Sequence, residues 1–144
     1  MRIIVCLDDD NGMMFNHRRQ SRDRVLCQDV LDICAGEKLY MNSYSAELFE
    51  KPAKEKTADL VVCEDFLEKA AQEAYCFVEN VDILPYQDKI CGIILYRWNR
   101  RYPGDVFFPL QIENGVWKLQ SSVAFSGSSH EEITREIYVR EMDM

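Results

Sequence analysis

The sequence has 144 residues, of which 47% are apolar and 29% charged, a balance typical of one folded globular domain. Its formal net charge of −8 repels nucleic acid backbones and anionic membranes, so we expect neither as a partner. The apolar runs are far shorter than the roughly 20 residues that cross a bilayer. Acidic residues follow the first apolar run at once, at positions 8–10, which is unlike a signal peptide. We therefore expect a single domain over residues 1–144, located in the cytoplasm.

Hydrophobic periodicity divides the chain into strands and helices. In chain order it predicts a strand over 2–7, a helix over 21–35, a strand over 38–41, a short helix over 45–50, a strand over 60–63, a helix start at 64–65, a strand over 75–78, a helical turn over 81–87, and strands over 90–98, 116–125 and 133–140. The polar stretch 50–56 is short enough for a surface loop. Strands that alternate with helices and are then followed by strands alone indicate an α/β fold. We expect a mainly parallel central sheet flanked by helices, with antiparallel C-terminal strands.

The residue types that bind metals do not gather into a recognisable site. None of the six cysteines forms a C-x-x-C pair, and most lie in apolar runs such as 61–63, where a free thiol behaves as a small buried hydrophobe. His17 and His130 are the only histidines, and neither belongs to a metal-binding motif. Asp8 and its two acidic neighbours alternate sides in an extended chain, which favours a solvated loop over a Mg²⁺ site. We expect no metal.

One local exception to the acidic composition is a basic cluster before the first helix, formed by His17, Arg18, Arg19, Arg22 and Arg24. A solvated loop leading into the helix start is the favoured interpretation. The alternative is a site for an anion or an acidic partner.

Both ends of the chain resemble dihydrofolate reductase. Residues 4–8 (IVCLD) and 11–14 (NGMM) are similar to the family's first strand and N-G-I-G loop. Near the C-terminus, 104–109 (GDVFFP) resembles the G-D-T-x-F-P motif, and 136–140 (EIYVR) resembles the closing strand. The similarity spans nearly the whole chain and implies a dihydrofolate reductase-like fold with NADPH as cofactor.

The cofactor motifs of that family are altered in this chain. The family binds the pyrophosphate with backbone at a diglycine and at a G-R-K/H-T turn, because glycine allows close approach. The corresponding residues here are Glu79 and Asn80, whose carboxylate repels phosphate, and 42–45 (NSYS). The positions that the resemblance places near the cofactor are Cys6, Asn11, Gly12, Ser45, Glu79 and Asn80.

The catalytic acid of the family is also displaced. Counted back from Gly36 without gaps, Leu26 takes the position of the acid in the first helix. Asp23 and Asp29 lie one helical turn to either side, and a shift in register brings either into the pocket as the acid. Tyr96 stands where the family has a supporting threonine, so Leu26 and Tyr96 are expected to line the substrate pocket.

Three functions follow from this pattern. The favoured one is a divergent reductase-like protein, a pseudoenzyme that does not reduce dihydrofolate with NADPH and binds a small molecule or a protein partner. The first alternative is an oxidoreductase of this type with an altered cofactor or substrate in the same cleft, using Asp23 or Asp29 as acid, Ser45 at the phosphate turn and basic residues such as Arg19 for an anionic group. The second alternative is an assembly or interaction protein. The sequence assigns neither a natural ligand nor an oligomeric state.

Overall fold

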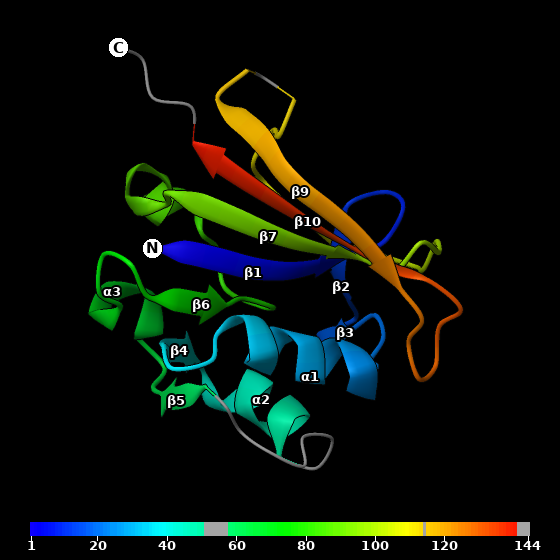
Figure 1. Cartoon of the computed structure of the whole chain (residues 1–144), viewed down its shortest axis with the longest axis horizontal. Coiled ribbons are helices and arrows are strands. Elements are labelled where there is room, and N and C mark those ends of the chain that lie inside the picture. The colour runs from blue at the N-terminus through cyan, green and yellow to red at the C-terminus, as the bar shows by residue number, and fades with distance from the viewer. Residues whose placement is uncertain (51–57, 114, 141–144) are drawn as a thin grey trace.

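A seven-stranded sheet forms the centre of the molecule, as Figure 1 shows for the computed structural model, which describes residues 1–50, 58–113 and 115–140. The strand order is β5-β4-β6-β1-β7-β10-β9. The strands are β1 (Arg2–Leu7), β4 (Lys38–Met41), β5 (Asp59–Val62), β6 (Tyr75–Phe77), β7 (Gly92–Arg97), β9 (Trp117–Phe125) and β10 (Ile133–Arg140). All neighbouring pairs are parallel except β7–β10 and β10–β9. The predicted architecture is therefore confirmed.

Helices cover both faces of this sheet. The longest, α1 (Arg24–Ile33), crosses the face seen in front in Figure 1. Its apolar residues recur at helical spacing, so one side of the helix is buried against the sheet. The shorter helical segments are α2 (Ser43–Ala46), η1 (Glu47–Phe49), α3 (Phe66–Lys69) and η2 (Leu84–Lys89). No helix in the described part of the chain is long and apolar enough to cross a membrane.

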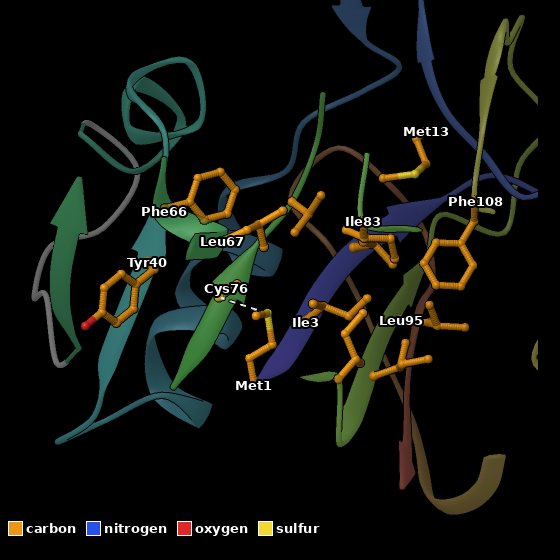
Figure 2. Packing of buried hydrophobic residues seen from close by; sticks show 14 of the residues in the cluster. Met1, Ile3, Met13, Tyr40, Phe66, Leu67, Cys76, Ile83, Leu95 and Phe108 are labelled. Atoms are coloured by element: carbon orange, nitrogen blue, oxygen red, sulfur yellow. Dashed lines mark hydrogen bonds between the residues drawn. The ribbon is translucent and has the colours of Figure 1, made fainter. Parts of the chain in front are cut away.

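Strand β1 shows why the core has two halves. Successive side chains of a strand point to opposite faces, so Ile3 and Val5 pack into one buried cluster and Ile4 into the other. Figure 2 shows the cluster on the face opposite α1, where Phe66 and Leu67 gather with side chains from the central strands. A strand buried on both faces is typical of a parallel sheet, and this matches the continuous apolar run at the start of the sequence.

A second, three-stranded sheet was not predicted. It has the order β3-β2-β8, with strands β2 (Gly12–Phe15), β3 (Arg18–Arg19) and β8 (Val106–Phe107). Two arginines of the basic cluster, expected in a solvated loop, instead form a strand that pairs with β2. Arg18 is exposed, as expected, whereas the expectation is wrong for Arg19, whose side chain is only 12% exposed. Strands of two to four residues carry too little periodicity to be detected in the sequence.

The element boundaries agree with the expectations to within a few residues. The strands at 38–41 and 133–140 have the predicted bounds. The helix predicted from residue 21 begins at Arg24, because Asp23 caps its N-terminus. The short helix predicted at 45–50 begins two residues earlier, and η2 begins three residues later than predicted. Residues 51–56 of the expected surface loop lie outside the described residues.

The six cysteines are all free. Cys27, Cys34 and Cys76 are buried, whereas Cys91 is exposed. Burial raises the pKa of each of the three buried thiols to about 12. These thiols are therefore protonated, unreactive parts of the core.

Candidate functional site

The carboxyl ends of the parallel strands meet on one edge of the sheet, where α/β folds bind ligands. Cys6 lies at the end of β1, Asn42 directly follows β4, and Glu79 lies two residues after β6. The end of β1, the segment after β6 and α1 surround a cavity of about 10 Å³, lined among others by Cys6, Glu79 and Leu26. That volume admits about one water molecule, so no ligand fits beside Glu79. A neighbouring pocket of about 350 Å³ shares Asp23, Cys27 and Leu48 with this cavity and opens between the start of α1 and the loop at 128–129.

An ion pair between Arg19 and Glu79 occupies this cleft. The Nε of Arg19 donates to Oε2 of Glu79 at 2.8 Å, and Nη2 donates to Oε1 at 3.1 Å. The two side chains are only 12% and 9% exposed. Such a two-pronged contact is among the strongest that a carboxylate makes. The hydroxyl of Ser45 also donates to Oε1, at 2.8 Å, so Glu79 receives three donors.

The turn after β4 holds Arg19 in place. The backbone N–H of Arg19 donates to the hydroxyl of Tyr44 at 2.8 Å, and its Nη2 donates to the Tyr44 carbonyl at 3.1 Å. The guanidinium also lies over the Tyr44 ring, 4.4 Å from its centre. Burial lowers the pKa of Arg19, but its hydrogen bond to Glu79 and the charge of Glu79 outweigh burial and raise that pKa. Arg19, Tyr44, Ser45 and Glu79 are called the latch below.

The same turn is joined to the residue after Glu79. The side-chain amide of Asn42 donates to Oδ1 of Asn80 at 2.8 Å. Oδ1 of Asn42 accepts from the backbone N–H of Ser45 at 3.1 Å and caps α2. The structure thus brings Ser45, Glu79 and Asn80 together. Ser45 bonds directly to Glu79, whereas Asn80 is joined to Ser45 through Asn42.

Asp23 anchors the start of α1 to the loop between β9 and β10. Its side chain is fully buried, at 0% exposure. Oδ1 accepts from the backbone N–H groups of Val25, Leu26 and Ser128 at 2.9 to 3.2 Å, and Oδ2 accepts from that of Ser129 at 2.8 Å. Burial alone raises the pKa of a carboxyl, but these donors and His130 hold the pKa of Asp23 well below its usual range.

His130 completes this cluster, which is called the Asp23 anchor below and comprises Asp23, Ser128, Ser129 and His130. Nδ1 of His130 lies 3.1 Å from Oδ2 of Asp23, and its ring stacks on Trp98 with 4.5 Å between the centres. A Cβ on Gly127 would collide with Oδ2 of Asp23, so only glycine fits at that position. The anchor fixes the loop against the helix.

The far side of His130 meets two hydroxyl groups. Nε2 lies 2.8 Å from the hydroxyl of Tyr102 and 3.1 Å from that of Ser21. A carboxylate, an imidazole and a hydroxyl in this order also activate nucleophiles in hydrolases. However, the cavity that Ser21 borders is water-sized, and Tyr102 shares the nitrogen that would act as base. The geometry supports a structural role.

Asp29 lies on α1, where it faces β7 and β10. The hydroxyl of Tyr96 donates to its Oδ2 at 2.6 Å, and Nη1 of Arg135 contacts both carboxylate oxygens at 2.7 and 2.8 Å. Burial and the nearby Asp29 raise the pKa of Tyr96 well above its ordinary value. Tyr96 thus pairs with Asp29 on the sheet and is not among the described residues that line the cavity, whereas Leu26 is.

Two further candidates form a tight turn at the end of β1. Asn11 has a positive φ of 62° and accepts from Nη1 of Arg97 at 3.1 Å through Oδ1. The N–H of Gly12 donates to Oδ1 of Asp8 at 2.7 Å. The solvated loop expected at 8–10 is wrong for Asp8, which is buried and also accepts from the N–H of Tyr102 at 3.0 Å. Buried carboxylates need such donors, and the turn supplies them.

Comparison with known proteins identifies the fold of the chain. No family model matches the chain, and no curated protein sequence matches it. Among solved structures, dihydrofolate reductase from Enterococcus faecalis, in complex with NADP(H) and RAB-propyl, matches with a TM-score of 0.66. The match covers 98% of this chain and 96% of that chain at 10% sequence identity. The fold is that of dihydrofolate reductase.

Within the dihydrofolate reductase fold, three members of the latch, Tyr44, Ser45 and Glu79, lie in the two segments that the sequence resemblance assigns to the cofactor pyrophosphate, and Arg19 reaches them from β3. A carboxylate already receives the available donors there, from Arg19 and Ser45. A phosphate would compete with Glu79 for these donors and would be repelled by it. The residues present therefore do not fit the pyrophosphate of NADPH.

Sequence reasoning identified Glu79 as a carboxylate at a position where the resembled family has glycine, but it did not identify Arg19 as the partner of Glu79. Arg19 and Glu79 are 60 positions apart, and Arg19 was one of five basic residues in the cluster. A buried carboxylate requires a nearby donor, and that requirement was the available signal. Asp23 was identified as a candidate acid, whereas its contacts with 128–130 come from a polar loop with no distinctive pattern.

Proposed function

We propose that this protein is a binding module with the dihydrofolate reductase fold and that it does not reduce dihydrofolate with NADPH. The observation that carries the proposal is the latch, in which the Glu79 carboxylate takes the place of an anionic ligand beside Arg19 and Ser45. Because the cavity beside the latch measures about 10 Å³, a small molecule has no room next to Glu79, and a protein partner is favoured over a ligand at that position. The module then works through its surface.

An altered reductase-like enzyme has less support. That function requires Asp23 or Asp29 to deliver a proton to a substrate in the cleft. Both oxygens of Asp23 receive backbone N–H donors, and both oxygens of Asp29 contact Arg135. Each carboxylate is thus engaged by donors of this chain, which disfavours proton delivery to a substrate.

Ligand-induced stabilisation tests the proposal. A ligand at about 100 times its dissociation constant raises the free energy of unfolding by about 2.7 kcal/mol, a clear rise in melting temperature for a domain of this size. We expect no rise with NADPH, dihydrofolate or an antifolate, and no oxidation of NADPH in the presence of dihydrofolate. The Enterococcus faecalis reductase, run in parallel, provides the positive control. A rise with NADPH for the wild-type protein would contradict the proposal.

A variant of the latch shows whether Glu79 is the cause. The double substitution Glu79→Gly and Asn80→Gly restores the diglycine and removes the competing carboxylate. We expect this variant to gain weak stabilisation by NADPH that the wild-type protein lacks. The single variant Asn80→Gly retains the carboxylate and serves as its matched control. If the double variant and the control behave alike, Glu79 is not what excludes the cofactor.

A further inference from the structure

Strand β9 lies at one edge of the large sheet, with β10 on its inner side and no strand on its outer side among the described residues. Every second residue of such an edge directs its backbone N–H and C=O groups outward, ready to pair with another strand. Proteins usually protect long edges with charged residues or proline. Of the nine residues of β9, only Lys118 is charged, and none is proline.

The opposite edge shows the usual protection. Strand β5 has four residues and begins with Asp59. Besides Lys118, strand β9 has a second protective feature, a bulge at Gln120, where its pairing with β10 skips a residue. The bulge leaves Ser121 to Phe125 as a regular segment that pairs residue by residue with β10. This segment carries no charge at all.

The sequence of this segment permits pairing with a second copy of itself. If two copies align antiparallel about a two-fold axis at Val123, that residue meets its own copy, Ser122 meets Ala124, and Ser121 meets Phe125. No like charges come to lie opposite each other, and such pairs are what destabilise cross-strand contacts. Val123 is 43% exposed, so its side chain is available for the contact.

Net charge limits where two copies can meet. Each chain carries a formal charge of −8, so contact between acidic faces is repulsive. The uncharged segment avoids that repulsion. Beside it, a groove of about 440 Å³ between α1 and the end of β9 is lined by Val25 and Phe125 together with polar and charged residues, among them Arg24, Asp29 and Asp32. The uncharged contact surface is therefore confined to the strand itself.

We propose that the outer edge of β9 pairs with β9 of a second copy of this chain, which joins two sheets into one across a two-fold axis at Val123. The pairing satisfies the outward backbone groups of residues 121–125 and buries Val123 against its own copy. It specifies the protein partner that the proposed function expects. The two proposals fail separately, because a dimer that binds NADPH would contradict only the function, and a monomer that ignores NADPH would contradict only the pairing.

Charge substitution at the two-fold axis provides the test. In Val123→Lys the introduced charges face each other, so we expect light scattering after size-exclusion chromatography to show the loss of dimer, with an unchanged circular dichroism spectrum. Val62→Lys places the same charge at a similarly exposed site, 48% exposed, on the opposite edge strand. This control is expected to remain dimeric like the wild-type protein.

Mixing two charge variants separates lost pairing from misfolding. Val123→Lys and Val123→Glu are each expected to be monomeric, and their equimolar mixture is expected to regain the mass of two chains, because opposite charges then face each other. A wild-type protein with the mass of one chain at every concentration would overturn the proposal. So would a Val123→Lys protein that dimerises as well as the wild type, or a mixture that stays monomeric.

Discussion

The latch and the Asp23 anchor both hold the segment before α1, but they stabilise their buried carboxylates in different ways. In the latch, the charge of Glu79 is balanced by the charge of Arg19. In the anchor, the charge of Asp23 is surrounded mainly by neutral donors, four of which are backbone N–H groups. A side-chain partner can be replaced together with the carboxylate, whereas backbone donors remain after any substitution.

This difference predicts how each cluster tolerates change. A buried ion pair can often be replaced as a unit by apolar residues without loss of stability, although removal of one partner is strongly destabilising. Backbone groups that lose their acceptor stay buried and unsatisfied. The anchor is therefore expected to be required for folding stability, and the latch to depend on the match between its two charges.

The largest effect is expected from Asp23→Ala. The substitution removes the cap of α1 and leaves the N–H groups of Ser128 and Ser129 without an acceptor. We expect a loss of about 4 kcal/mol in the free energy of unfolding, measured with urea. Asp32→Ala, an exposed site on the same helix, serves as control and is expected to change stability by less than about 0.5 kcal/mol. Equal losses at the two sites would contradict the assignment of the anchor.

A double-mutant cycle on the latch is expected to give the next largest effect. Glu79→Leu and Arg19→Met each leave one buried charge without its partner, and each is expected to reduce the free energy of unfolding by about 3 kcal/mol. The double variant removes both charges, so we expect it to lie within about 1 kcal/mol of the wild-type protein. Losses that simply add would show that the two side chains act independently.

The sequence predicted the large sheet better than either cluster, for a physical reason. Periodicity within a strand is local, so the strands at 38–41 and 133–140 were predicted with their observed bounds. Strand β2 pairs with β8, and Gly12 meets Phe107 across a long stretch of sequence. Contacts of this kind depend on how the whole chain folds, and two-residue strands provide no pattern of their own.

The same limit applies to the candidate site. Glu79 could be identified because the sequence resemblance places it where the dihydrofolate reductase motif has glycine. The roles of Arg19 and His130 could not be predicted, because each depends on a side chain far away in the sequence. Asp23 and Asp29 were considered as acids because each lies one helical turn from Leu26, where the resemblance places the family's acid, and the structure adds the donors that surround each one.

The smallest expected effect concerns pH and distinguishes the charge of Asp23 from its shape. Because the pKa of Asp23 is lower in the folded protein than the value of about 3.9 in an unfolded chain, its ionised form contributes stability above about pH 4. That contribution decreases as the pH falls toward the folded pKa, by at most about 1.4 kcal/mol per pH unit. Asp23→Asn keeps one acceptor oxygen but does not titrate. We expect this variant to be less stable than the wild-type protein by about 2 kcal/mol at pH 7 and the difference to narrow below pH 4, as measured by urea unfolding across pH. A difference that stays constant down to pH 2 would mean that the anchor requires the shape of Asp23 and not its charge.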